Sequence, residues 1–128
     1  MKKIIIDSKE VASPIGPYSS AVMKGNFIFI SGTVGVDKDG KIVGENDIGL
    51  QTKKTFQNIK ILLEQVGATM NDIVKITVFL KDKKDYEEMN KIRAEFFPAD
   101  PPASSAVAIK DFMLPGLLVE IEAIAIKD

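Results

Sequence analysis

The chain has 128 residues, of which 45% are hydrophobic and 27% are charged, and its formal net charge is −1. This length predicts one domain over residues 1–128, and the balanced charge excludes the basic field of a nucleic-acid-binding protein and a polybasic membrane patch. The absence of cysteine and histidine excludes disulfides, thiol chemistry and the commonest zinc ligand and general base.

Short strands and tight turns are predicted for the first third of the chain. Residues 2–6 form a candidate strand, and Ala21–Lys24 and Phe27–Ser31 form a candidate hairpin around a Gly-Asn turn. The stretch "SPIGPYSS" between them is rich in turn residues. The apolar run near the N-terminus is too short for a signal peptide, and no segment reaches membrane-spanning length, so we expect a cytoplasmic protein.

Two amphipathic helices are predicted in the remainder. Apolar residues recur at helical spacing over about Asp47–Val66, followed by Gly67 as a C-cap, and again over about Lys84–Phe97. Alternating residues predict a strand at 72–82, and the last strands are expected at 103–110 and 116–127. This order predicts an α+β fold, in which a mixed sheet carries two helices on one face.

The last strand is apolar on both of its faces. Val119, Ile121 and Ala123 alternate with Leu118 and Ile124. Because two helices can cover only one face of the sheet, the second apolar face requires another partner, and a homo-oligomer is the simplest solution.

The same strand carries Glu120 and Glu122, whose side chains should leave one face about 7 Å apart. Carboxylates among aliphatic neighbours are costly unless they are paired or functional. They therefore indicate either a functional site or an edge strand whose glutamates pair with lysines across the sheet.

Four further features are candidates for a pocket. Tyr18 lies in a proline-braced turn, where it either lines a pocket or simply packs. The small residues of Ile30–Gly35 allow close backbone approach to a ligand or form a bulge. Asn90 on the second helix is expected to be buried, as a structural tie or a ligand contact. Arg93, one turn later, either snorkels or pairs with a carboxylate at an interface, or it binds an anion.

The combined motifs resemble the RidA/YjgF family of reactive intermediate deaminases, also called the endoribonuclease L-PSP family. The matching stretches occur in family order and cover nearly the whole chain: "IGPYSSAV", "ISGTVGVD", "QTKKTFQNIKILLEQVGATMNDIVKITVFLKD", "NKIRAEFF", "PPASSAV" and "VEIEAIAI". The resemblance implies a chorismate-mutase-like subunit and a homotrimer with a central barrel and ligand clefts between subunits. It also implies hydrolysis of enamines and imines of the 2-aminoacrylate type to 2-oxo acids and ammonia, without a cofactor or metal.

The resemblance also assigns roles to individual positions. Glu120 matches the glutamate that positions the hydrolytic water, and Tyr18 matches the pocket tyrosine of the "GPY" turn. The implied substrate-binding positions are Ser31, Gly32, Asn90, Ser104 and Ala106.

One position departs from the family pattern. The family motif "PARS" carries an arginine that clamps the substrate carboxylate, whereas this chain has "PASS", with Ser104 at that position. A single serine hydroxyl contributes only about 1 kcal/mol to binding, which is less than a bidentate arginine–carboxylate pair contributes. We therefore expect the affinity for small imino acids to be weaker by roughly 10²–10³-fold. Arg93 is a hypothetical replacement for the missing charge.

Two functions therefore remain open at this point. The chain is an imine or enamine hydrolase, or it is a trimeric protein that binds or senses 2-oxo acids without turnover. A ribonuclease activity, suggested only by the older family name, is disfavoured by the net charge of −1 and the lack of histidine.

Overall fold

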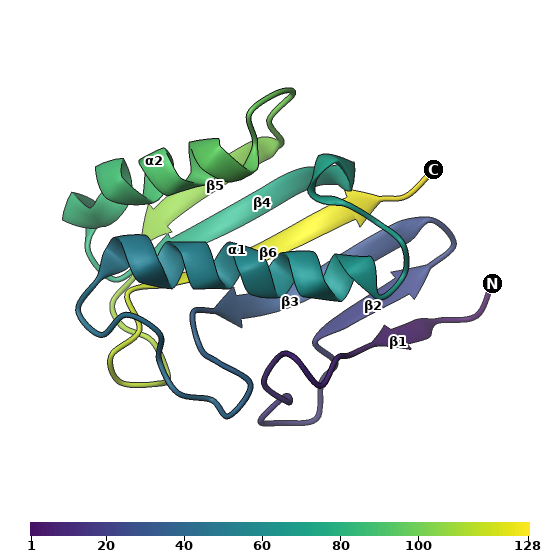
Figure 1. Cartoon of the computed structure of the whole chain (residues 1–128), viewed down its shortest axis with the longest axis horizontal. Helices are drawn as coiled ribbons and strands as arrows, with labels where there is room; N and C mark the ends of the chain where they lie inside the picture. Colours follow the sequence, from purple (N-terminus) through teal and green to yellow (C-terminus); the bar gives the residue numbers. More distant parts are fainter.

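The computed structural model describes all 128 residues, which form a six-stranded mixed sheet with two helices on one face (Figure 1). The strands are β1 (Ile4–Ile6), β2 (Ala21–Lys24), β3 (Phe27–Val34), β4 (Ile73–Leu80), β5 (Ala103–Ala108) and β6 (Val119–Ile126). Their order in the sheet is β1-β2-β3-β6-β4-β5, and only β4 and β5 are parallel. The helices are α1 (Ile48–Glu64) and α2 (Tyr86–Phe96), so the predicted α+β class is confirmed.

Helix α1 forms where the sequence predicts it, but it begins one residue later and ends two residues earlier, with Gln65 rather than Gly67 as its C-cap. The Asp47 side chain caps its N-terminus by accepting a hydrogen bond of 3.0 Å from the Leu50 amide. Gly67, just beyond its C-terminus, has a φ of +73°, which is strained for any residue with a side chain. Helix α2 begins two residues later than predicted, because Lys83–Asp85 form a separate 3₁₀ turn.

Strand β3 is longer than predicted. The hairpin strand was expected to end at Ser31, but pairing with β6 resumes at Thr33 and continues to Val34. The ends of β1, β5 and β6 lie inside the predicted ranges. The error in β3 arises because "SGT" contains a bulge, which interrupts the ladder without ending the strand.

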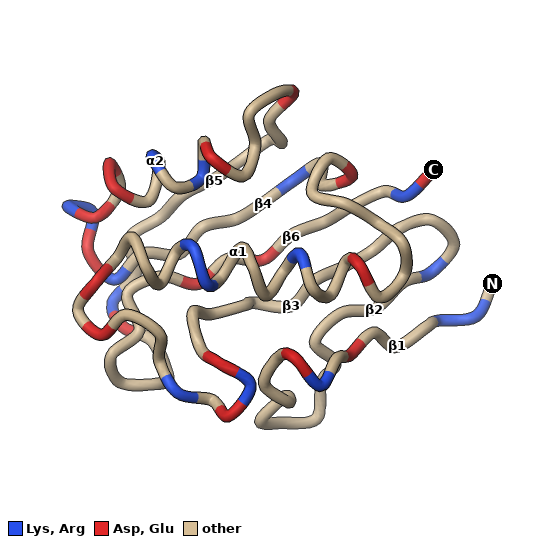
Figure 2. The backbone as a smooth tube through the Cα atoms, in the orientation of Figure 1, with Lys and Arg blue, Asp and Glu red and all other residues tan.

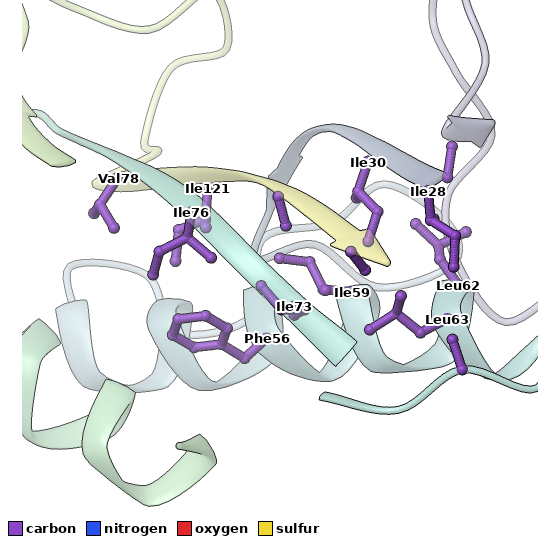
Figure 3. Close-up of a cluster of buried hydrophobic side chains, with 14 of the residues drawn as sticks. Ile28, Ile30, Phe56, Ile59, Leu62, Leu63, Ile73, Ile76, Val78 and Ile121 are labelled. Atoms are coloured by element: carbon purple, nitrogen blue, oxygen red, sulfur yellow. The ribbon is translucent and has the colours of Figure 1, made fainter. Parts of the chain in front are cut away.

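The main core lies between α1 and the sheet (Figure 3). Phe56, Ile59 and Leu63 of α1 pack toward the sheet, where Ile28 of β3 and Ile76 of β4 are fully buried. Burial of each such side chain contributes about 1.5–3 kcal/mol. This layer fixes the helices over one face and leaves the other face uncovered.

The uncovered face of the sheet is largely apolar. Phe27 and Phe29 are each 45% exposed, and their rings stack with centroids 6.3 Å apart. They pair in register with Ile126 and Ile124 of β6, whose side chains are partly exposed. A second apolar face without helices is therefore confirmed, whereas its burial by other copies of the chain stays a prediction.

Charged residues are distributed over the whole chain, with both signs interspersed (Figure 2). The three salt bridges all join exposed side chains at 3.7–4.0 Å. Neither helix is long and apolar enough to cross a membrane.

A buried glutamine connects α1 to two loops. The Gln51 amide nitrogen donates to the carbonyls of Gly44 and Gly116 at 3.1 and 3.0 Å, and its oxygen accepts from the Leu118 amide at 2.8 Å. Gln51 is fully buried, so these backbone groups have little access to water.

We predict that Gln51→Ala lowers the free energy of unfolding by about 2–4 kcal/mol, because it leaves buried backbone groups unpaired and opens a cavity. Urea unfolding followed by circular dichroism measures this loss. Gln65→Ala, which removes an exposed side chain from the end of the same helix, is the control and should change stability by less than about 0.5 kcal/mol. Equal effects of the two substitutions would contradict the structural role of Gln51.

Candidate active site

A cavity of about 270 Å³ lies beside the end of β3. Four of the predicted site residues line it: Tyr18, Ser31, Gly32 and Glu120. Its other walls are mostly apolar and come from the N-terminal loop, the loop after β3, α1 and the loop before β6, including Val11, Ile15, Val36, Leu62, Met113, Leu114 and Leu117. Such a pocket, apolar with a few polar groups, is typical of a small-molecule site.

The bulge in β3 makes room for the Glu120 carboxyl group. Ile30 pairs with Ala123 and Thr33 with Ile121, so β3 has one more residue than β6 between these pairs. Gly32 lies in this extra length, and a Cβ atom there would stand only 2.5 Å from Oε2 of Glu120. A glycine is therefore required at this position for the carboxyl group to lie where it does.

Glu120 is half-buried on β6, a central strand between β3 and β4. Burial raises the pKa of its carboxyl group, and the negative charge of Glu122 raises that pKa further. Neither glutamate forms a salt bridge. The alternative of an edge strand whose glutamates pair with lysines is therefore wrong, because the strand is central and no lysine neutralises them.

Ser31 holds the loop that carries Tyr18 against the sheet. Its hydroxyl donates a 2.6 Å hydrogen bond to the Ser19 carbonyl, so only its oxygen lone pairs remain for a ligand. Tyr18 is 52% exposed at the cavity wall. Ser31 can thus accept a hydrogen bond from an N–H group in the cavity, and the Tyr18 hydroxyl is free to donate or accept.

A second group of predicted residues surrounds Arg93. Its guanidinium donates from Nη1 to Oγ of Ser104 at 2.9 Å and from Nη2 to the Tyr86 hydroxyl at 2.9 Å. Oδ1 of Asn90 accepts from Nη2 at 2.6 Å and from Nε at 3.2 Å. Asn90 is exposed rather than buried, so that expectation is wrong. Arg93 pairs with no carboxylate of its own chain, and its pairing at an interface between chains stays a prediction.

One copy of the chain does not bring these two groups together. Ser104 pairs with Ile76 and Ala106 with Val78, so both belong to the helix-covered face of the edge strand β5. Glu120 pairs with Phe79 on the open face. Strand β4 lies between β5 and β6, which places the two groups about 10 Å apart across the sheet, on opposite faces.

Comparison with known proteins identifies the family. Residues 9–127 match the family model described as Endoribonuclease L-PSP. A RutC family protein of Pyrococcus abyssi is 43% identical over 129 residues, which cover 100% of both chains. The crystal structure of RidA from an Antarctic Psychrobacter is 31% identical, with a TM-score of 0.89, over 96% of this chain and 98% of that one. E. coli TdcF with bound serine is 31% identical, with a TM-score of 0.90, over 98% and 99% of the two chains.

The chain belongs to the RidA/YjgF family. Ser104, where the resemblance leads us to expect an arginine, accepts a hydrogen bond of 2.9 Å from Arg93, so a cation contacts this position. No group of three or more acidic residues is arranged to hold a metal ion.

Sequence reasoning missed two residues of these groups. The Tyr86 hydroxyl of α2 accepts a hydrogen bond from Arg93, whose guanidinium also lies 5.6 Å from the centre of the Tyr86 ring. Asn58 of α1 is buried, lines the cavity and donates to the carbonyls of Val34 and Val36 at 3.0 and 2.9 Å. An asparagine directly before Ile59 in an apolar stripe was the available signal.

We predict that Gly32→Ala displaces the Glu120 carboxyl group toward water and lowers its pKa toward that of an ordinary glutamate. The side-chain end can move, so the free energy of unfolding should change by less than about 1 kcal/mol. Carboxyl-detected NMR titration measures the pKa. Gly49→Ala on α1, where a Cβ atom meets only ordinary contacts, is the matched control. An unchanged Glu120 titration in Gly32→Ala would contradict the close approach.

The raised pKa of Glu120 also makes stability depend on pH. The folded chain holds this proton more tightly than the unfolded chain, so the free energy of unfolding should fall as pH rises from the ordinary glutamate pKa through the raised value. Glu120→Gln should lack this fall, so its free energy of unfolding should rise relative to that of the wild type across that interval. Urea unfolding between about pH 4 and pH 8 measures it. Parallel profiles would contradict the raised pKa.

Proposed function

We propose that the chain hydrolyses small imines and enamines derived from amino acids to 2-oxo acids and ammonia, with Glu120 as the proton-transfer group. Family membership supports a general role in imine deamination or small-molecule binding. The observation that favours hydrolysis is a carboxyl group of raised pKa at the wall of an apolar cavity. General acid–base catalysis is most efficient when the pKa of the group lies near the working pH.

The proposed reaction needs only water and proton transfers. An enamine first takes up a proton on carbon and becomes the imine. Water adds to the C=N carbon while Glu120 takes a proton from the water and the imine nitrogen gains a proton from solvent. In the resulting carbinolamine, Glu120 gives its proton to the nitrogen, the hydroxyl group loses its proton to solvent as the C=O bond forms, and the C–N bond breaks to release ammonia. An imine carbon is already electrophilic, so positioning and proton transfer supply the main rate enhancement. We propose no cofactor.

The residues around the cavity have complementary roles in this proposal. The oxygen of Ser31 accepts a hydrogen bond from the substrate nitrogen, because its own proton is already donated to Ser19. The Tyr18 hydroxyl lies at the same wall and moves a proton to or from the carbinolamine. Gly32 keeps space for the Glu120 carboxyl group. The serine bound to the similar protein TdcF supports a ligand of the size of a small amino acid.

We further propose that the chain works as a homotrimer with clefts between subunits. Two features support this assembly: the apolar open face that carries Phe27 and Phe29, and the edge strand β5, whose residues are all exposed. Packing of the open faces would bury this surface and bring β5 of one subunit toward Glu120 of the next. The two groups of site residues, separated in one chain, would then border one cleft.

The alternative function is binding or sensing of a 2-oxo acid without turnover. It is favoured by Ser104, because loss of the motif arginine weakens the hold on a carboxylate. The alternative uses the same cleft but does not need the raised pKa of Glu120.

Ammonia release tests the proposal, with imines generated in situ by an amino-acid oxidase. The wild type should accelerate ammonia release over the oxidase alone, and Glu120→Gln should reduce the acceleration by about 10²-fold or more. Glu95→Gln, at an exposed position on α2, is the matched control and should keep full activity. A wild type without activity that nevertheless binds pyruvate would support the sensor, and full activity of Glu120→Gln would exclude the proposed role of Glu120.

A further inference from the structure

Arg93 is a fixed cation without a counter-ion. Its hydrogen-bond partners are the oxygens of Ser104, Asn90 and Tyr86, all of which are neutral. No carboxylate lies within salt-bridge distance of it, and Glu88 on the same helix pairs with Lys91 at 3.9 Å. A guanidinium that is held in place but not neutralised is a ready site for an anion.

The inventory of donors shows what remains for a ligand. A guanidinium has five N–H groups. Here Nε uses its single N–H on Asn90, Nη2 contacts Asn90 and Tyr86, and Nη1 uses one N–H on Ser104. One Nη1–H therefore remains free. Ser104 accepts from Arg93 and donates to no protein group, so its own hydroxyl proton is also free.

We propose that Arg93 and Ser104 together form a carboxylate-binding site in this chain. The free Nη1–H of Arg93 and the hydroxyl of Ser104 belong to atoms 2.9 Å apart, which lets one carboxylate accept from both. The positive charge comes from α2, and the serine on β5 supplies the second donor. The site takes a small monocarboxylate, and its assignment to the 2-oxo or imino acid of the reaction rests on the proposed function.

The surrounding contacts make the site rigid enough to select its ligand. Asn90 holds both Nε and Nη2, and the Tyr86 hydroxyl holds Nη2 from another direction, so rotation of the guanidinium would break several bonds. The cation also lies 5.6 Å from the centre of the Tyr86 ring. A lysine at position 93 would keep the charge but could not keep this set of fixed donors.

A purely structural role is the competing interpretation, in which Arg93 only ties α2 to β5. The two interpretations differ in their readouts. A structural tie changes the free energy of unfolding but leaves the affinity for carboxylates unchanged. A binding site changes the affinity for a carboxylate and leaves the affinity for a neutral ligand of the same shape unchanged.

Titration with pyruvate, followed by NMR of the full-length protein, tests the proposal. Arg93→Met should weaken pyruvate binding by about 10-fold or more, and Ser104→Ala by about 5-fold. Arg93→Lys should also bind more weakly than the wild type. Lys91→Met removes a positive charge from the same helix outside the site, and its affinity should stay within about 2-fold of the wild type. Pyruvamide, the neutral analogue, should bind wild type and Arg93→Met equally.

Several results would overturn the proposal. Arg93→Met with wild-type affinity for pyruvate, while its spectrum shows a folded chain, would leave only the structural role. An equal loss in Lys91→Met would show a diffuse charge effect instead of a site. Full affinity in Arg93→Lys would exclude the two-donor geometry.

Failure of this inference and failure of the proposed reaction are distinguishable. If no variant releases ammonia but pyruvate binding depends on Arg93, the carboxylate site stands and the hydrolase proposal falls. If ammonia release depends on Glu120 but neither pyruvate affinity nor KM depends on Arg93, the hydrolase stands and the carboxylate site falls.

Discussion

The structure depends on a sheet with two apolar faces and helices for only one of them. Helices α1 and α2 lie over one face of the sheet (Figure 1). That face carries the buried Ile28, Ile76 and Ile121, while Phe27 and Phe29 remain exposed on the other. Exposed apolar area of this kind favours association. The same open face carries Glu120, so the surface that needs a partner and the carboxyl group with the raised pKa adjoin each other.

The site is built at some cost to the fold. A half-buried carboxyl group beside a second glutamate is less stable in its charged form, and a bulge interrupts the ladder between β3 and β6. Position 32 is a glycine, and any side chain there would collide with the Glu120 carboxyl group. Deviations from regular structure that cluster around one cavity are typical of functional sites.

The sequence predicted the elements well where periodicity alone decides them, as in α1, β4 and the two faces of β6. It failed where a tertiary contact decides. The bulge at Ser31–Gly32 depends on pairing with β6, and the environment of Arg93 depends on the approach of α2 to β5, which brings Arg93 to Ser104, eleven residues later in the chain. The resemblance to the family predicted both groups of candidate site residues, but only the structure shows that they lie on opposite faces of one chain.

The central claim is that copies of this chain cover its open face and complete the site. Sedimentation equilibrium of the purified protein tests it most directly, because the chain has a mass of 14.0 kDa and each subunit added is easily distinguished. The account predicts the mass of three chains, and a shift toward the single chain when Phe29 is replaced by glutamate on the open face. A wild type that sediments as a monomer at all concentrations would contradict the account.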